Sequence, residues 1–267
     1  MYIFKIIIPT LALVSFGYHN KSTIKERARA VEARMVKVND TFYMARTELT
    51  NEEYNKFLAA HPGQSWLQPD STKWSNHPLG SKLAHEYSSL KNYPVVAITY
   101  EAAMEYCKWL TEMYMARPGR KFKKVKFTLP SRQDWLTSAH ADKPQYIYPW
   151  GRWGLKARTG EVLAMYREIG DEQITFDSAT QKLVVVVSKE EVDKRDTWPA
   201  PVKTFWHKSS LELYNVCGNV AEMVTEKGIA VGGSYNDAGY DVRIAAIKHY
   251  NQPSSDIGFR VAMYIQQ

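Results

Sequence analysis

Residues able to do chemistry are few in this sequence and do not form a familiar catalytic motif. The chain has 267 residues, with two cysteines, Cys107 and Cys217, and seven histidines. No histidine is followed four residues later by another, so the helical spacing that directs two imidazoles at one zinc ion does not occur. GxSxG, P-loop and GxGxxG motifs are also absent from the sequence. The usual hydrolase and nucleotide-binding chemistries are therefore not expected.

A glycine-rich stretch at 232–235 is followed by two aspartates and a histidine, in the order Asp237, Asp241 and His249. A pocket that brings these three side chains together would allow acid–base chemistry. Aspartates in glycine-rich loops also form turn hydrogen bonds, and Arg243 is placed to bridge the two carboxylates. We expect the structural role and keep catalysis by these three residues as the alternative.

Composition and charge indicate a globular protein with a basic surface. Hydrophobic residues make up 45% of the chain and charged residues 24%, which supplies enough apolar material for a core. The formal net charge is +7, and residues 117–126 contain six basic groups and no acid. This segment is either a solvated loop or a surface for an anionic partner such as an acidic glycan. No nucleic-acid-binding module is recognisable, so nucleic acid is not expected as a partner.

The N-terminal residues 2–16 are almost entirely apolar. A stretch of about 15 residues is short for a membrane span but suits the core of a secretory signal. We predict cleavage after Gly17, so that residues 1–17 are a signal peptide, 18–34 a linker and 35–267 the domain. The mature protein would then be exported to the periplasm or the cell surface. If the segment is not cleaved, it is an anchor and the only contact with the membrane.

The pattern of apolar residues, caps and turns predicts an α+β domain with short strands, about three helices and long loops. Thr50 and Glu53 have the spacing of a capping box, and Ser131 is expected to cap a helix with Asp134 in its first turn. The predicted helices are 51–60, 100–115 and 131–139, and the predicted strands are a hairpin over 35–44 and the segments 93–99, 125–129 and 182–187. Residues 61–93 are expected to be irregular, because Pro, Gly, Asn and Ser interrupt them.

Seven segments of the chain resemble, in order, the motifs of one family. They are FYMARTELTNEEYNKFL from Phe42, YPVVAITYEAAMEYCKWL from Tyr93, FTLPSRQDW from Phe127, YPWG from Tyr148, LYNVCGNVAEMV from Leu213, GGSYND from Gly232 and IGFRVAM from Ile257. The family is that of the formylglycine-generating enzyme, or sulfatase-modifying factor. The resemblance covers about 35–263 and implies a C-type-lectin-like domain with long loops, which agrees with the predicted elements.

The resemblance also implies a structural calcium site. In the family, backbone oxygens and one glutamate of the LYNVCGNVAEMV-type segment bind the ion. On this sequence the ligands would be Cys217, Gly218, Val220 and Glu222. Calcium prefers oxygen ligands, backbone carbonyls included, so this set is chemically sensible. The alternative is that Glu222 pairs with a basic group and binds no ion.

Active members of the family carry two cysteines after the GGS motif, and these bind copper and activate oxygen. Here Asn236 and Asp237 stand after that motif, and the chain has no cysteine beyond Cys217. Copper is therefore not expected, because Cu(I) favours soft thiolate ligands. Cys107 matches a family half-cystine, but the position of its partner is occupied by Val261. We expect Cys107 to be a buried thiol on its helix.

These observations favour an exported, non-catalytic member of the family that acts as a binding or assembly module in the cell envelope. Cysteine-free members of this kind resemble components of gliding motility and type IX secretion. The partner would be an envelope protein or a glycan. Two alternatives remain open: an oxygen- or metal-dependent oxidase of the family with a non-cysteine site, and a lectin-like module for glycans or polyanions.

Overall fold

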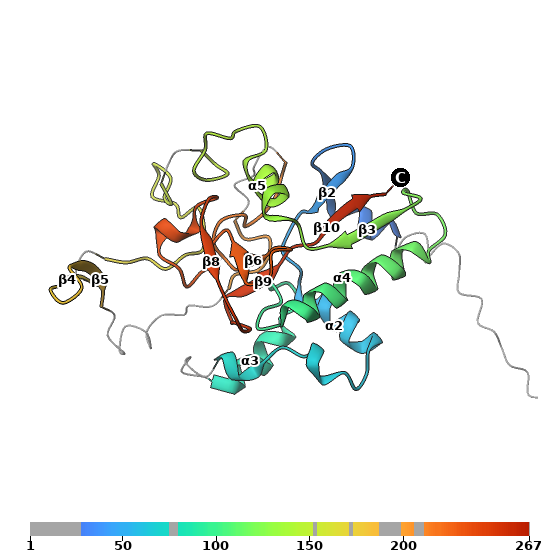
Figure 1. Ribbon diagram of the computed structural model, residues 1–267, viewed down its shortest axis with the longest axis horizontal. Helices are drawn as coiled ribbons and strands as arrows, with labels where there is room; N and C mark the ends of the chain where they lie inside the picture. The colour runs from blue at the N-terminus through green and yellow to red at the C-terminus, as the bar shows by residue number, and fades with distance from the viewer. Residues whose placement is uncertain are drawn as a thin grey trace, which may run out of the picture.

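The computed structural model describes residues 28–74, 80–151, 154–170, 173–186, 199–205 and 211–266. The predicted signal peptide, residues 1–17, lies outside these ranges. Within them, no helix combines the length and the apolar character needed to cross a membrane. The described chain forms two four-stranded sheets and a separate hairpin, with helices packed around the sheets (Figure 1).

The first sheet brings the two ends of the described chain together. Its strands, in spatial order, are β1 (Met35–Lys37), β2 (Phe42–Ala45), β10 (Ala262–Ile265) and β3 (Val125–Thr128), and all neighbours are antiparallel. β1 and β2 confirm the predicted hairpin, and β3 confirms the predicted strand at 125–129. The hairpin turn is closed by Asn39, whose side-chain oxygen accepts a hydrogen bond from the Thr41 amide at 3.0 Å.

The second sheet carries Glu222, Lys248 and His249, three of the residues discussed below. Its strands, in spatial order, are β8 (Ile247–His249), β7 (Ile229–Val231), β6 (Ala221–Met223) and β9 (Ile257–Phe259). β6 and β9 are parallel, and the other pairs are antiparallel. Two further strands, β4 (Ile174–Asp177) and β5 (Lys182–Val185), form a hairpin that projects on the left of Figure 1. β5 confirms a strand in the predicted region 182–187.

The three predicted helices form, and their predicted caps are present. The helices are α2 (Asn51–Ala60), α3 (Gly80–Ser89), α4 (Tyr100–Met115), α5 (Arg132–His140) and the short 3₁₀ helices η1 (Ser65–Leu67), η2 (Ser71–Trp74) and η4 (Gly239–Val242). The Thr50 hydroxyl accepts from the Glu53 amide, and the Glu53 carboxylate accepts from the Thr50 amide. The Ser131 hydroxyl caps α5 by accepting a hydrogen bond from the Asp134 amide at 3.0 Å. These bonds satisfy amides that have no partner within a helix, which fixes where α2 and α5 begin.

Two predictions between residues 61 and 99 are wrong. Residues 61–93 are not wholly irregular, because they contain α3 as well as η1 and η2. Residues 93–99 do not form a strand, since Ala97 has a φ of 59° that interrupts an extended run. The Val95 amide donates to the Leu49 carbonyl, so this apolar segment is buried against a loop and not in a ladder. A short apolar run indicates burial but does not identify the structure that buries it.

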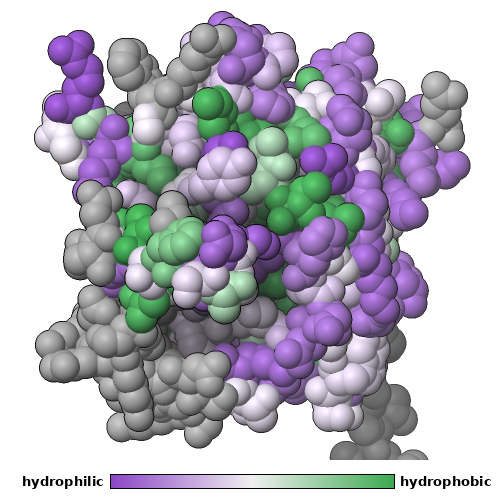
Figure 2. All heavy atoms as spheres, turned by 60° about the vertical axis from the view of Figure 1, so that its left-hand side comes forward, coloured by the Kyte–Doolittle hydropathy of each residue, from purple (hydrophilic) through white to green (hydrophobic). Residues whose placement is uncertain are grey.

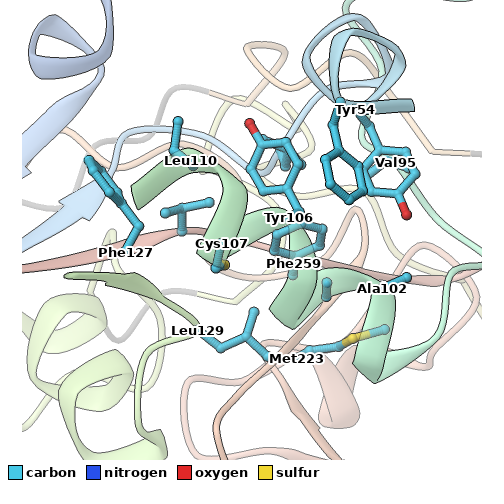
Figure 3. Close-up of a cluster of buried hydrophobic side chains, with 14 of the residues drawn as sticks. Tyr54, Val95, Ala102, Tyr106, Cys107, Leu110, Phe127, Leu129, Met223 and Phe259 are labelled. Carbon is cyan, nitrogen blue, oxygen red and sulfur yellow. The ribbon is translucent and has the colours of Figure 1, made fainter. Parts of the chain in front are cut away.

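The main core lies between α4 and strands of both sheets. Figure 3 shows Tyr106 and Cys107 of α4 close to Phe259, and the ring centroids of Tyr106 and Phe259 are 5.7 Å apart. Cys107 is 1% exposed, and burial raises the pKa of its thiol far above the usual range. Residues 28–33 are helical, and Val31 belongs to the same core. The last residues of the predicted linker therefore pack with the domain.

Candidate functional site

The loop after β7 passes close to the chain segment that contains Cys217. Gly232 has a φ of 83°, and a Cβ atom built on it would lie 2.5 Å from the Val216 carbonyl oxygen. The Gly218 amide donates to the Gly232 carbonyl at 2.9 Å. Only glycine combines this positive φ with so close an approach of two backbones. Gly232 therefore determines the path of the backbone from β7 to the buried Ser234.

Lys248 on β8 ties this loop to the loop before β9. Its ammonium nitrogen lies 2.8 Å from the Asp237 carboxylate and 2.5 Å from the Asp256 carboxylate. The Ser234 hydroxyl donates to Asp237 at 2.6 Å, and the Ser254 hydroxyl donates to Asp256. We call these five residues the Lys248 cluster. The cluster fixes the position of Asp237. In the sequence, Asp237 is the second residue after the GGSY segment at 232–235.

Lys248 and Asp256 of this cluster remain charged at neutral pH. Burial tends to raise the pKa of Asp256, but the Lys248 ammonium outweighs it and holds that pKa below the ordinary value. Burial likewise tends to lower the pKa of Lys248, and the two carboxylates outweigh it and raise that pKa. A protonated lysine is not a base or a nucleophile. The cluster is therefore suited to holding the loop in place and not to proton abstraction.

The three residues proposed for acid–base catalysis do not form one site. Asp237 belongs to the Lys248 cluster, whereas Asp241 in η4 and His249 in β8 are exposed. In the described part of the chain, no three His, Cys, Asp or Glu side chains lie close enough together to hold a metal ion. The prediction that Arg243 bridges the two aspartates is wrong. Its Nε donates to the Tyr240 carbonyl at 2.7 Å, and its guanidinium carbon lies 3.3 Å from the centroid of the Tyr240 ring.

Glu222 on β6 and Arg260 after β9 form a fully buried ion pair. Arg260 Nε lies 3.0 Å from both carboxylate oxygens, and one terminal nitrogen lies 2.6 Å from Glu222 Oε1. Trp135 Nε1 donates to Glu222 Oε2 at 2.7 Å. The remaining guanidinium bonds go to the carbonyls of Ala45 and Tyr214 at 3.1 and 2.7 Å. The charges are thus satisfied within the protein, which joins β2, β6 and α5 at one point.

The resemblance implies four calcium ligands, and in this structure the carboxylate among them is engaged by other partners. Cys217, Gly218 and Val220 lie just before Glu222, and the glutamate is the only carboxylate among the four. Both of its oxygens already accept hydrogen bonds, and a calcium ion bound to them would lie against the Arg260 charge. Glu222 pairs with a basic group, as the alternative from the sequence foresaw. Calcium binding by these residues stays a prediction from the resemblance.

A second buried carboxylate, Glu48, is not singled out by the sequence reasoning. It is 0% exposed, and its two oxygens accept from Asn219 Nδ2 at 2.8 Å and Asn215 Nδ2 at 3.3 Å. Burial raises its pKa to about 8, although the nearby charge of Arg260 acts in the opposite direction. The only signal in the sequence is its place in the ELTN part of a family-like segment, because periodicity predicts nothing for a single buried acid.

Both cysteines are buried away from solvent. Cys217 and Cys107 are each 1% exposed and unpaired. Burial raises the pKa of the Cys217 thiol well above its ordinary value, with a smaller contribution from Glu222 in the same direction. Copper binding and nucleophilic attack require the thiolate. Neither cysteine is therefore available for the chemistry of the family's cysteine pair.

An aromatic surface lies beside η4. Tyr240 is 70% exposed with Arg243 stacked on its ring, while Tyr148 and Trp150 stack in parallel with centroids 5.1 Å apart. The Tyr148 hydroxyl donates to the Gly239 carbonyl at 3.3 Å, which places this pair next to η4. Tyr148 itself is buried, at 9% exposure, and supports the partly buried Trp150. We call Tyr240, Arg243 and Trp150 the Tyr240 surface. Figure 2, which turns the left of Figure 1 forward, shows apolar side chains gathered in patches among hydrophilic ones.

Comparisons with known proteins agree on the fold. The sequence model of a family described as "Sulfatase-modifying factor enzyme 1-like domain" matches residues 10–265. The chain is similar to the crystal structure of CarF, with a TM-score of 0.54, 19% identity, and coverage of 84% of this chain and 87% of CarF. It is also similar to PvdO from Pseudomonas aeruginosa, with a TM-score of 0.56, 16% identity, and coverage of 84% of this chain and 80% of PvdO. No curated protein matches the sequence.

Proposed function

Since this chain belongs to the family of sulfatase-modifying factor enzyme 1-like domains, we propose that it is a non-catalytic member that acts as a binding or assembly module. The main support for the proposal is which residues the loop after β7 contains and what they contact. Where active members have cysteines, this loop has Asn236 and Asp237, and Asp237 is held by Lys248 at 2.8 Å. A carboxylate does not replace the soft thiolates that Cu(I) favours, and the ion pair with Lys248 already engages this one.

An oxidase with a non-cysteine site is the weaker proposal. Such a site would need free ligands for a redox metal. Asp237 is neutralised by Lys248, and Asp241 and His249 are exposed without a third ligand near them among the described residues. The alternative would require the Lys248 cluster to open before a metal could bind.

A lectin-like role is a second candidate, and the Tyr240 surface favours it. An exposed tyrosine ring with a planar cation stacked on it offers flat faces and hydrogen-bond donors at the same place. Glycans present both apolar ring faces and hydroxyl groups. Exposed aromatic side chains of this kind often mark a binding site. We place the binding function of the module at this surface.

We propose that the protein works outside the cytoplasm, in the periplasm or on the cell surface. The support is the apolar segment at 2–16, which has the length of a secretory signal core. A role in gliding motility or type IX secretion is the specific form of this proposal, and it rests on the likeness to cysteine-free family members. The partner is then an envelope protein or an envelope glycan.

The test compares binding to envelope material by the wild type and two variants. Extracts separated into a protein and a glycan fraction are passed over the immobilised protein. We expect one fraction to be retained and Tyr240→Ala to reduce retention at least about tenfold, as for an interface anchor. The matched control is Phe176→Ala, which removes another exposed aromatic ring, 56% exposed, from the β4–β5 hairpin. Equal retention by wild type and Tyr240→Ala would contradict a binding role for this surface.

A further inference from the structure

The basic segment 117–126 joins α4 to β3 and lies on the right of Figure 1, opposite the β4–β5 hairpin. It contains six basic groups and no acid. The function proposed above does not involve this segment, because the Tyr240 surface is formed by other parts of the chain. The contacts of its charged side chains decide whether the segment is only a solvated loop.

The backbone of this loop is held in one shape by contacts with its own side chains and with β2. The Arg120 guanidinium donates to the carbonyls of Arg117 and Lys123 at 3.0 and 3.4 Å. The Phe122 ring packs edge-on against the ring of Tyr43, with centroids 5.2 Å apart. A loop that is ordered before binding loses little entropy when it contacts a ligand.

Glu32, in the helical residues 28–33, contacts the loop but does not neutralise a lysine side chain. Its Oε1 atom accepts from the Lys121 amide and from the Tyr114 hydroxyl, each at 2.6 Å. The Lys121 ammonium lies instead over the Phe122 ring, 5.1 Å from its centroid. Glu32 therefore fixes the loop through its backbone and leaves the Lys121 ammonium without an ion pair.

Three more cations on this side of the molecule also lack an ion-pair partner. Lys123 and Lys126 are exposed, and neither is paired with an acid in the described ranges. Arg29 is likewise exposed and unpaired there, one helical turn before Glu32 and on the same face of the helix. We call Arg29, Lys121, Lys123 and Lys126 the Lys123 surface.

This lack of pairing is not general on the described surface. Most of the other lysines form ion pairs with an acid, namely Lys37, Lys56, Lys73, Lys108, Lys143, Lys156, Lys227 and Lys248. The protein thus neutralises most lysines internally and leaves those of the Lys123 surface available to an anion from outside.

We propose that the Lys123 surface binds an anionic polysaccharide, with the acidic groups of successive sugars on its four cations. Coulomb attraction supplies the affinity, and the ordered backbone sets the spacing of the charges. A membrane fits less well, because residues 28–33 and 117–126 have no exposed large apolar side chain to insert. The same lack of exposed rings disfavours single-stranded nucleic acid, whose bases stack on aromatic side chains. The proposal does not depend on the function proposed for the Tyr240 surface.

Calorimetric titration of the full chain with dextran sulfate at several salt concentrations tests the proposal. Unsulfated dextran of the same length is the control for the sugar backbone, and vesicles of phosphatidylcholine with phosphatidylglycerol test a membrane. We expect saturable binding of dextran sulfate that weakens as salt is raised, because salt screens exposed charges. Equal binding of dextran, tighter binding of the vesicles, or no saturable binding of dextran sulfate would overturn the proposal.

A double variant, Lys123→Glu with Lys126→Glu, locates the site. It should weaken dextran sulfate binding at least about tenfold and make the salt dependence shallower, because two contacts with the polyanion are lost. The matched control is Lys182→Glu with Lys203→Glu, which makes the same charge change at exposed lysines of β5 and of the segment 199–205. Unchanged melting curves show that both variants are folded. If the control weakens binding as much, the polyanion responds to net charge alone and the Lys123 surface is not the site.

Discussion

The ion pair between Glu222 and Arg260 shows how residues typical of the family serve architecture in this chain. Both side chains are buried, with 1% and 0% exposure, and they connect β6, the residue after β9 and the last residue of β2. Removing one partner of such a pair leaves a charge in a medium that solvates it poorly. The pair therefore stabilises the fold only when both charged side chains are present.

Glu222→Gln should lower the free energy of unfolding by about 3–5 kcal/mol, because Arg260 would keep its charge without a buried counterion. Urea unfolding at pH 7 measures the change. The control is Glu168→Gln, which removes an exposed partner of Lys156 and should cost less than about 1 kcal/mol. A loss for Glu222→Gln no greater than that of the control would show that the pair is not essential.

The same variant tests the predicted calcium site. Because both oxygens of Glu222 are occupied, the difference in Tm between calcium and chelator buffers should be equal in wild type and Glu222→Gln. A ligand that binds the native state raises Tm. A calcium-dependent rise that the variant loses would make Glu222 a ligand after all.

Glu48 should make stability depend on pH. Its pKa is about 8 in the folded protein and near 4.5 when unfolded, so the folded state binds the proton more tightly. The resulting stabilisation is complete below pH 4.5 and is lost as the pH rises through 8, at about 1.4 kcal/mol per pKa unit of difference. Urea unfolding in chelator between pH 5 and 9 should show this decline in wild type. Glu48→Gln should flatten it, and an unchanged slope would contradict the assignment.

At the scale of elements, the sequence predicts the helix starts, because neighbouring residues in the chain form the caps that determine them. The capping residues Thr50 and Ser131 give α2 and α5 their first turns, and both caps are present. The predictions fail where tertiary contacts decide, as at Ala97, whose segment is buried by other loops. The Lys248 cluster could not be foreseen, because its members come from three segments that only the second sheet brings together.

Lys248→Met should loosen the loops on either side of β8. The variant leaves the carboxylates of Asp237 and Asp256 without their ammonium partner, at a cost of about 2–3 kcal/mol at pH 7. The folded-state pKa of Asp256 lies below its ordinary value of 3.8, so the stabilisation is present above pH 4 and disappears as the pH falls further. Urea unfolding should show a larger difference from wild type at pH 7 than at pH 3. Equal differences at both pH values would mean that the ion pairs are not the cause.

At the scale of the whole molecule, the chain keeps the family fold, and its loop after β7 contains no cysteine. The framework glycines remain where backbones touch, as at Gly232 and at Gly258, where a Cβ atom would lie 2.6 Å from the Val95 carbonyl. Fold and family follow from such residues and were predictable from the sequence. The ligand was not, because a candidate surface such as the one around Tyr240 is formed by segments far apart in the chain.

The central claim is that this member does not oxidise cysteine with copper. The most direct measurement loads the purified protein with Cu(I), adds oxygen and a cysteine-containing peptide, and follows oxygen uptake and peptide mass, with an active family member as the positive control. The account predicts copper well below one equivalent, no peptide-dependent oxygen uptake and an unchanged peptide. Copper near one equivalent together with conversion of the peptide cysteine to an aldehyde would contradict it.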